Sequence, residues 1–350
     1  MQRILVTGGV GFIGSHTSLL LIEKGYEILI VDSLINSSIK ALERINKIID
    51  IEFPNMKNKL SFFKGDLRDE GFIRDIFSSQ NKIGKPITGV IHFAGLKSIN
   101  QSINEPLNYW DSNLVSTINL LKVMNSFECK TIVFSSSASV YGAPKIDLIN
   151  EDQKLDPINP YGLTKFTIEK VLFNLYESSS KEWKIINLRY FNPIGAHSSG
   201  LLGEVPMGIP NNIFPLIMEV ALGNIESFKI YGNDWPTTDG TGIRDYIHVM
   251  DLANGHFYAL EHLINNAPRI LNLNLGTGIG TSVLELINTF ERVNKIKIPF
   301  HFSDRRKGDA SIVVADNSLL KNILKWKPAK NLEDMCRDGW RWKKLNPKGY

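Results

Sequence analysis

The sequence lacks the features that mark secreted and membrane-spanning proteins. Its two cysteines, Cys129 and Cys336, are too few for a disulfide framework and show no metal-ligand spacing, so we expect a reducing cytoplasm and no metal site. No apolar run is longer than four residues, as in Leu19–Ile22, whereas a membrane span needs roughly 18 residues. Met1–Arg3 leads directly into a strand-like stretch, and we therefore expect no secretory signal and no membrane partner.

The chain also has little excess charge of either sign. Lys and Arg number 40 against 36 Asp and Glu, which gives a formal net charge of +4. The nearest approach to a basic cluster, Asp304–Lys307, is short and begins with an acid, so we expect no nucleic-acid partner. Hydrophobic residues at 43% and charged residues at 22% exclude a disordered or fibrous chain.

What the sequence does have is an alternation of strand-like and helix-like patterns. In the first half of the 350 residues, apolar runs rich in Val, Ile and Phe are separated by longer amphipathic stretches. This alternation predicts an α/β fold class, with a doubly wound parallel sheet covered by helices on both faces. The expected strands lie at 3–7, 28–32, 60–64, 87–94, 130–135 and 184–190, and the expected helices at 13–24, 38–50, 69–80, 105–127 and 161–178.

The pattern changes after residue 190, where prolines become frequent and the strand-like runs become short. We therefore predict a first domain over 1–190 and a smaller α/β C-terminal substrate domain over 191–350, with 244–262 as a candidate to return to the first domain. The second half has short patterned stretches at 228–232 and 244–248, and it is expected to contain strands at 270–275 and 298–302 and helices at 251–263, 282–294, 316–324 and 331–344.

A glycine-rich turn follows the first expected strand. Gly8, Gly11 and Gly14 have the spacing that gives a tight turn, lets a pyrophosphate approach the backbone and packs the helix closely on the strand. The helix N-terminus then offers unpaired N–H groups to phosphate. Asp32 ends the second strand, where an acid can bind both hydroxyls of an adenosine ribose, so NAD is favoured over NADP in a Rossmann-type domain.

Tyr161 and Lys165 lie one turn apart at the start of an expected helix. An ammonium group beside a phenol favours the phenolate, which could then act as a general base for an alcohol proton. Ser137, at the end of the fifth strand, has a hydroxyl placed to bond both a substrate oxygen and Tyr161. Taken singly, a Tyr-x-x-x-Lys pair is typical of a solvated helix face, and a serine cluster is typical of a turn.

In this order on one sheet, the three motifs resemble those of the extended short-chain dehydrogenase/reductase family, and most closely its nucleotide-sugar 4-epimerases. The resemblance implies an NAD-dependent isomerase that interconverts UDP-galactose and UDP-glucose, works as a homodimer through helices 105–127 and 161–178, and stays bound to its cofactor. The segments that carry the resemblance are Thr7–His16, His92–Lys97, Ser135–Gly142, Tyr161–Lys165, Leu188–Pro193, Gly208–Asn212, Asp239–Val249 and Arg305–Asp309.

The same resemblance implies roles for individual residues. Tyr161 would take the proton of the sugar 4-hydroxyl, Ser137 would bond the reacting oxygen, and Lys165 would hold the nicotinamide ribose while the 4-keto sugar turns over and is reduced on its other face. The implied cofactor contacts are Gly8, Gly11, Phe12, Ile13, Gly14, Asp32, Asn36, Asp66, Leu67, Phe93, Ala94, Gly95, Lys97, Asn113, Ser137, Tyr161, Lys165 and Phe191. The implied substrate contacts are Lys97, Ser137, Tyr161, Asn192, Asn211, Asn212, Ile213, Lys229, Tyr231, Arg244, Arg306, Asp309 and Val313.

Several of these residues also have structural interpretations. Arg244 and Arg306 offer planar forks for a diphosphate, but Arg244 could instead form a salt bridge with its neighbour Asp245. Asn212 and Asp66 could each be a helix N-cap.

Position 313 departs from the family pattern. A tyrosine often crowds the sugar there in relatives restricted to plain hexoses, whereas Val313 leaves room, so we hypothesise additional activity on UDP-GlcNAc and UDP-GalNAc. The alternative is that a neighbouring loop refills the space.

Two other functions compete with epimerisation. A nucleotide-sugar 4,6-dehydratase would need an Asp-Glu pair just after Ser137, where this chain has Ala138 and Ser139. A non-catalytic NAD-binding sensor would typically have lost Tyr161 or Lys165, and this chain keeps both.

Overall fold

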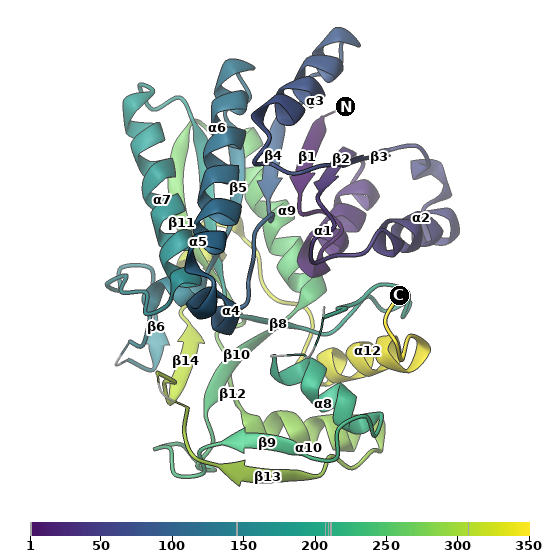
Figure 1. Cartoon of the computed structure of the whole chain (residues 1–350), viewed down its shortest axis with the longest axis vertical. Helices are drawn as coiled ribbons and strands as arrows, with labels where there is room; N and C mark the ends of the chain where they lie inside the picture. The colour runs from purple at the N-terminus through teal and green to yellow at the C-terminus, as the bar shows by residue number, and fades with distance from the viewer. Residues whose placement is uncertain (1, 145, 207, 209, 211, 307) are drawn as a thin grey trace. The chain divides into compact units, whose positions relative to one another are not determined.

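By its internal contacts the chain divides into two compact units (Figure 1). The computed structural model describes residues 2–144, 146–206, 208, 210, 212–306 and 308–350. The first unit consists of 1–142, 155–189 and 253–273, and the second of 143–154, 190–252 and 274–350. The sequence predicts a first domain over 1–190 with 244–262 returning to it. The first unit instead leaves out 143–154, and the segment that returns to it is 253–273.

The first unit is built on a parallel sheet, as the alternating sequence pattern predicts. Strand β1 pairs in parallel with β2 on one side and β4 on the other, with Val6 in register with both Ile30 and Ile91. Chain order therefore reverses on either side of β1, which is where ligands bind in such sheets, beyond the carboxyl ends of the strands. In the described residues seven strands form this sheet, in the order β11 (Arg269–Leu275), β7 (Lys184–Tyr190), β5 (Thr131–Ser137), β4 (Gly89–His92), β1 (Arg3–Thr7), β2 (Glu27–Asp32) and β3 (Leu60–Lys64).

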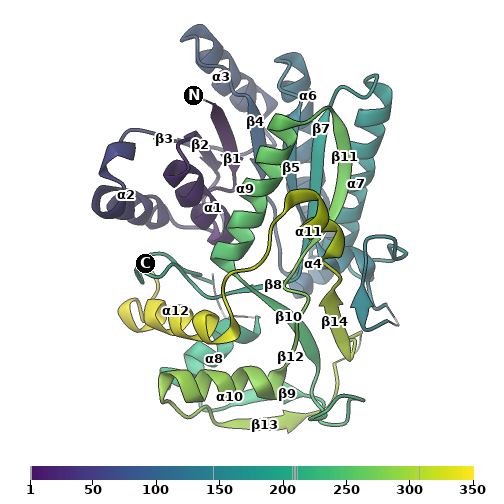
Figure 2. The same ribbon diagram turned by 180° about the vertical axis from the view of Figure 1, so that it is seen from behind.

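Helices cover both faces of this sheet. Helices α3, α6 and α7 lie over the face seen in Figure 1, and α9 lies over the face seen in Figure 2. Helix α7 begins at Pro160, because the Asn159 side chain accepts a hydrogen bond from the Gly162 N–H and proline is favoured in a first turn. The helices are α1 (Phe12–Glu23), α2 (Lys40–Glu52), η1 (Pro54–Met56), α3 (Glu70–Lys82), α4 (Ile99–Asn104), α5 (Pro106–Tyr109), η2 (Trp110–Val115), α6 (Ser116–Ser126), η3 (Ala138–Tyr141), α7 (Pro160–Ser178) and α9 (Val249–Asn265).

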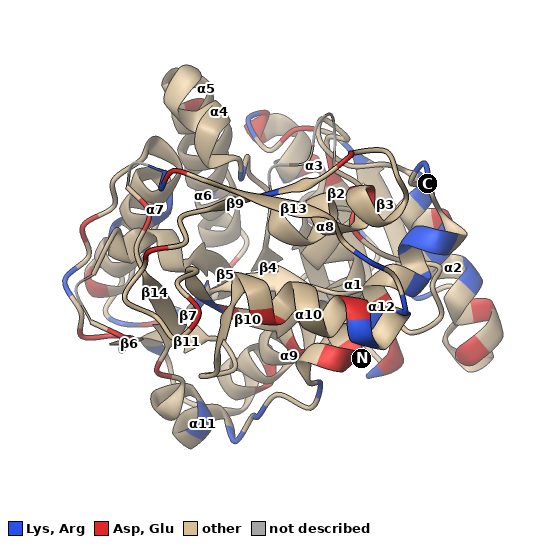
Figure 3. Ribbon diagram, turned by 90° about the horizontal axis from the view of Figure 1, so that it is seen from below, with Lys and Arg blue, Asp and Glu red and all other residues tan. Residues whose placement is uncertain are grey.

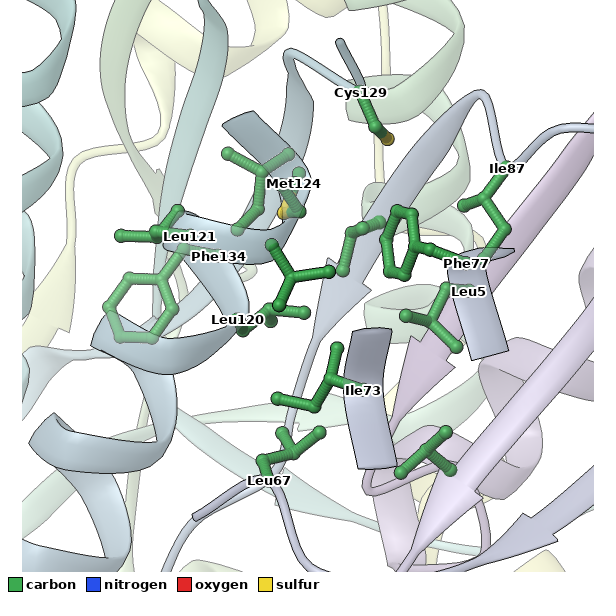
Figure 4. Packing of buried hydrophobic residues seen from close by; sticks show 14 of the residues in the cluster. Leu5, Leu67, Ile73, Phe77, Ile87, Leu120, Leu121, Met124, Cys129 and Phe134 are labelled. Atoms are coloured by element: carbon green, nitrogen blue, oxygen red, sulfur yellow. The ribbon is translucent and has the colours of Figure 1, made fainter. Parts of the chain in front are cut away.

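A continuous apolar core holds the sheet to α3, α6 and α7. Leu5, Ile73, Phe77, Leu120 and Phe134 are each 1% exposed or less, and Figure 4 shows their side chains in this core. Each such side chain stabilises the fold by about 1.5–3 kcal/mol when it is removed from water.

One expected strand belongs to a different unit from the one predicted. The sequence pattern placed 270–275 in the second domain, but β11 lies beside β7 at the edge of the seven-stranded sheet. Helix α9 returns the chain to this sheet (Figure 2), and the Asn187 side chain donates to that of Asn272 at 2.8 Å. The assignment was wrong because strand partners far apart in sequence leave no local signal.

The second unit is organised around β10 (Ile243–His248). This strand pairs with β8 (Asn192–Ile194), β12 (Gly280–Ser282) and β14 (Ile312–Ala315), and β14 continues to β6 (Leu148–Ile149). A separate two-stranded ribbon pairs β9 (Phe228–Tyr231) with β13 (Phe300–Ser303). The remaining helices are α8 (Ile213–Ala221), α10 (Val283–Asn294), α11 (Ser318–Leu324) and α12 (Leu332–Leu345).

Charged residues in both end turns and a capping side chain stabilise helix α12. Glu333 and Asp334 lie in its first turn and Lys343 and Lys344 in its last, so its charges complement the helix dipole (Figure 3). Asn331 caps the helix and its side chain accepts from the Asp334 N–H. Trp340 on its apolar face packs edge-on against Phe290 of α10.

None of the helices in the described part of the chain combines the length and the apolar character needed to cross a bilayer.

Candidate functional site

The glycines at positions 8 and 14, around the turn between β1 and α1, leave no room for a side chain. Gly8 has φ +67°, and a Cβ there would lie 2.7 Å from the Ala94 nitrogen. A Cβ on Gly14 would lie 2.2 Å from the Gly8 carbonyl oxygen, so α1 can begin this close to the turn only with glycine at that position. Phe12 and Ile13, in the first turn of α1, are half-buried. The open N-terminus of α1 and the bare glycine backbone form a cradle of the kind that receives a pyrophosphate.

Asp32 lies beside this turn, at the end of β2. Its carboxylate accepts hydrogen bonds from the Val10 N–H at 3.2 Å, the Leu34 N–H at 2.9 Å and the Ser37 hydroxyl at 2.7 Å. The acid is therefore held by loop groups and does not act as a helix cap. A carboxylate next to a phosphate cradle fits the adenosine ribose of NAD and repels a 2′-phosphate. Asn36, also predicted to contact the cofactor, lies exposed in the same loop.

Asn113 holds the loop after β4, which contains the predicted cofactor residues Phe93 to Lys97. Its side-chain oxygen accepts from the Leu96 N–H at 2.7 Å, and its amide donates to the Leu96 carbonyl at 3.1 Å and to Thr164 at 3.0 Å. Asn113 lies in η2, a π-helical segment that interrupts the single helix predicted over 105–127. The residue thus links the loop to α7, while its predicted contact with a cofactor stays a prediction.

The loop itself approaches its neighbours closely. A Cβ on Gly95 would lie 2.9 Å from the Asn113 side-chain oxygen, and the Lys97 ammonium lies 6.0 Å from the centre of the Phe12 ring. The Phe93 ring contacts the ring of His256 on α9, with 4.7 Å between the ring centres and 45° between the ring planes.

Asp66 and Leu67 follow β3. The Arg68 guanidinium beside Asp66, at 2.7 Å, lowers the pKa of that carboxyl, whereas Leu67 is buried in the apolar core. The interpretation of Asp66 as the cap of α3 is wrong, because Asp69 caps that helix.

Tyr161 and Lys165 are both buried on the inner face of α7. Their exposed fractions are 5% and 4%, so the interpretation as a solvated helix face is wrong. The Lys165 ammonium donates to the Ser135 carbonyl at 2.9 Å and lies 6.0 Å from the centre of the Tyr161 ring. Burial lowers the pKa of Lys165 to about 8, opposed by the negative charge of Glu169. The result is a cation held against a phenol in a region of low solvent access, the arrangement a tyrosine base requires.

Ser137 ends β5, two residues after the carbonyl that Lys165 binds. Its hydroxyl accepts from the Ser139 N–H at 3.2 Å and donates to the Ser139 hydroxyl at 3.1 Å. Ser137 therefore caps the short helix η3, in agreement with the structural interpretation of the serine cluster as part of a turn. Its hydroxyl also lies at the carboxyl edge of the sheet, where a substrate oxygen would be bound.

A buried histidine behind these residues was not assigned a role from the sequence. His92, at the end of β4, bonds Thr7 at 2.6 Å and Thr117 at 2.9 Å. Burial, together with the charge of Lys165, lowers the pKa of His92 to about 3. The imidazole is therefore neutral and links the ends of β1 and β4 to α6.

A buried ion pair next to Lys165 was also not predicted from the sequence. Glu169, one turn further along α7, binds Arg189 of β7 with 2.7 Å between their nearest charged atoms. Residues four apart in a helix lie on one face, so the sequence puts Glu169 beside Lys165. No local pattern in the sequence identifies Arg189 as the partner of Glu169.

In the second unit, Arg244 lies beside Val313. The two are in register on the parallel strands β10 and β14, and parallel partners face the same side of a sheet. Burial lowers the pKa of Arg244, opposed by the charge of Asp309 and reinforced by that of Arg306. The salt bridge proposed between Arg244 and Asp245 is wrong, because Asp245 accepts from Thr277, Gly278 and Ala315 instead.

Arg306 stacks on Tyr231. Its guanidinium lies 4.6 Å from the centre of the ring, and its Nε donates to Asp309 at 3.0 Å. The neighbouring Arg305, which is not among the predicted substrate contacts, stacks in the same way on Trp235 at 4.1 Å and donates to Asp234 at 2.7 Å. Two arginine–aromatic pairs therefore hold the loop after β13 to the end of β9 and to the loop that follows it.

The other predicted substrate residues of the second unit are spread over three elements. Asn212 is the N-cap residue of α8, as its structural interpretation holds, with Ile213 as the first helical residue, although its side chain makes no capping hydrogen bond. Lys229 is exposed on β9. Asn192 of β8 is half-buried next to buried Phe191 and is in register with Tyr246 of β10. Asn211 lies outside the described residues.

Comparison with known proteins gives a consistent result. A family model described as GDP-mannose 4,6 dehydratase matches residues 5–339. The chain is 47% identical over 350 residues to the bifunctional UDP-glucose 4-epimerase and UDP-xylose 4-epimerase 3 of Arabidopsis thaliana, covering 100% of this chain and 97% of the relative. It is similar to the crystal structure of a UDP-glucose-4-epimerase from Stenotrophomonas maltophila with bound NAD and formylated UDP-arabinopyranose, with TM-score 0.92, 42% identity and coverage of 99% and 98%. It is also similar to a UDP-glucose 4-epimerase from Bifidobacterium longum in complex with NAD+ and UDP, with TM-score 0.91, 43% identity and 100% coverage of both chains.

Proposed function

The chain belongs to the extended short-chain dehydrogenase/reductase family and, within it, to the UDP-glucose 4-epimerases, and from this premise we propose that it interconverts UDP-galactose and UDP-glucose with bound NAD. The observation that carries the proposal is the full-length similarity to such epimerases, at 42–47% identity in three comparisons. The buried Tyr161–Lys165 pair supports it independently, because a structural helix face would expose that lysine.

The first unit performs the proton chemistry in this proposal. Tyr161 takes the proton of the sugar 4-hydroxyl and later returns it, while the nearby Lys165 ammonium favours the phenolate. The Ser137 hydroxyl bonds the reacting oxygen. The glycine cradle and Asp32 would hold NAD, which would supply reversible hydride acceptance, so the reaction has no net redox change.

The second unit holds the nucleotide in this proposal. Arg244 and Arg306 carry the charge that a diphosphate requires, and each is preorganised, Arg244 by burial and Arg306 by its stack on Tyr231. Asn192, Asn211 and Asn212 offer amides to the sugar and uracil edges. Firm binding of UDP with looser binding of the sugar lets the 4-keto sugar turn over.

The matching family model carries the name of a dehydratase, so elimination of water is the competing reaction. That reaction needs an additional acid and base after the strand-end serine, and here Ala138 and Ser139 begin η3. Chromatography and mass spectrometry of UDP-galactose incubated with the protein distinguish the two reactions. Epimerisation gives UDP-glucose of unchanged mass, whereas dehydration gives a product lighter by one water and would refute the proposal.

We further propose that N-acetylated sugars are substrates. The observation that favours this extension is the position of Val313, half-buried and directly beside Arg244. A side chain without an aromatic ring next to the proposed diphosphate anchor leaves volume for an acetamido group. Turnover of UDP-GalNAc to UDP-GlcNAc tests it, and no turnover at millimolar substrate would exclude it.

We also propose that the protein is a cytoplasmic homodimer. Apolar side chains are exposed on the packed elements α4, α5, η2 and α7, and Leu107 is 81% exposed. Such a surface on neighbouring helices is typical of an interface. Sedimentation of the wild type and of Leu107→Glu tests the dimer, since the charged variant should be monomeric. Cell fractionation tests the location.

A further inference from the structure

A buried polar network lies directly behind Ser137 and Lys165. Glu169 accepts from the Ser136 hydroxyl at 2.6 Å, and Arg189 donates to both of its carboxylate oxygens, at 3.0 and 2.7 Å. Arg189 also donates to the Tyr141 hydroxyl at 2.9 Å, with its guanidinium 5.1 Å from the centre of that ring. All four side chains are at most 5% exposed, and they come from β5, η3, α7 and β7.

This network fixes how α7 lies along β5. Ser135, Ser136 and Ser137 are consecutive: the first accepts from Lys165, the second donates to Glu169, and the third is the predicted substrate-binding hydroxyl. Two bonds to α7, one helical turn apart, prevent the helix from sliding or rotating against the strand end. A misplacement of about 1 Å at a catalytic group can cost about 100-fold in rate.

We propose that Glu169, held by Arg189 and Ser136, is a positioning residue that sets Tyr161 and Lys165 against Ser137 for proton transfer. The inference rests on the proposed function and extends it to a residue that is not among the predicted substrate or cofactor contacts. A buried ion pair is by itself weak evidence for stabilisation. The proposed positioning of α7 gives this pair a functional role.

The charge of Glu169 also acts on Lys165. The groups that face Lys165 are Glu169 and Tyr161 on its own helix, neutral His92 on β4 and the Ser135 carbonyl on β5, with Arg189 behind Glu169. Glu169 supplies the negative charge that opposes the loss of the Lys165 proton. Removing that charge should therefore make Lys165 deprotonate at lower pH.

The test is the pH profile of kcat for UDP-galactose in the holoenzyme, from about pH 6 to about pH 10, for the wild type and Glu169→Gln. We expect kcat to fall about 10- to 100-fold with KM little changed. The alkaline limb should move to lower pH by about one unit. A second readout needs no turnover: the titration of the Lys165 ammonium followed by NMR with isotope-labelled lysine, the signal being identified by its absence in Lys165→Met.

The control is Glu27→Gln. Glu27 pairs with Arg3 where β1 and β2 begin, at the opposite end of the sheet from Ser137, so its loss should lower the melting temperature without moving the pH profile. Should Glu169→Gln not fold, Ser136→Ala removes one bond to the carboxylate, and we expect it to lower kcat, with Glu169→Asp intermediate. If Glu169→Gln and Ser136→Ala behave like Glu27→Gln, with unchanged profile, Lys165 titration and kcat, the inference is overturned. Absence of turnover in the wild type would instead refute the proposed function.

Discussion

The Lys165 ammonium donates a 2.9 Å hydrogen bond to the carbonyl of Ser135, two residues before the serine predicted to bind the substrate. One bond thus joins the helix of the proposed base to the strand end of the proposed oxygen ligand. The ring of Phe134 lies 4.8 Å from the same ammonium and helps to keep the cation away from water. Lysine at this position therefore has two tasks: it places α7 and it supplies positive charge near Tyr161.

Tyr161→Phe removes the proposed base while keeping the ring. We expect kcat for UDP-galactose to fall about 10²–10⁴-fold, the usual contribution of a positioned general base, with little change in KM. Tyr176→Phe is the matched control, because it makes the same change further along α7 and should leave kcat unchanged. Equal kcat values for wild type and Tyr161→Phe would contradict the proposed role.

His92 should remain neutral over the physiological range. Burial lowers its pKa from 6.5 to about 3, so below pH 6.5 the unfolded chain binds a proton that the folded protein does not. Stability should therefore be lost as pH falls from about 6.5 towards about 3. In NMR the ring protons of His92, identified by comparison with His92→Gln, should not shift between about pH 5 and about pH 8, and a titration there would contradict the account.

Gly14→Ala should disrupt the cradle. The added methyl would lie 2.2 Å from the Gly8 carbonyl oxygen, so the start of α1 must move away from the turn. We expect loss of bound NAD on gel filtration and a lower melting temperature. Gly71→Ala, also in the first turn of a helix, adds its methyl 3.2 Å from a side-chain oxygen of Asp69 and should retain NAD. Full NAD retention by Gly14→Ala would count against this site.

Arg244→Met should weaken nucleotide binding more than it slows chemistry. Loss of a charged hydrogen bond to phosphate raises KM by about 10- to 100-fold, and kcat should change little. Arg292→Met, which removes an exposed pair with Glu333 in the same unit, is the control and should leave KM unchanged. An unaltered KM in Arg244→Met would remove this residue from the proposed site.

Val313→Tyr should narrow the substrate range. A tyrosine beside Arg244 fills the volume left by valine, so UDP-GalNAc turnover should fall while UDP-galactose turnover is retained. The measurement is the ratio of kcat/KM for the two substrates. An unchanged ratio would favour the alternative that a neighbouring loop fills the volume that the valine leaves beside the sugar.

The sequence predicted the parts of this protein that depend on local pattern. The strands at 3–7, 60–64 and 184–190 match β1, β3 and β7, because short apolar runs between glycines and helices leave little choice of structure. The fold class is confirmed by the parallel sheet and by the solved structures it resembles.

Features that depend on long-range partners were not predicted. Asn113, in the π-helical segment, bonds Leu96 of the loop after β4, and the Glu169–Arg189 pair joins residues on different elements. The stack of Arg305 on Trp235 joins two loops of the second unit. In each case the stabilising free energy comes from a contact between distant parts of the chain. Composition and periodicity do not reveal such contacts.

The most direct test of the central claim uses protein freed of loose cofactor by gel filtration and given UDP-galactose without added NAD. We expect UDP-glucose to form over many turnovers, with no lasting rise in the NADH absorption band, because the cofactor stays bound and returns to its oxidised form in each cycle. Accumulation of NADH in proportion to the substrate consumed, or a strict requirement for added NAD in every turnover, would contradict it.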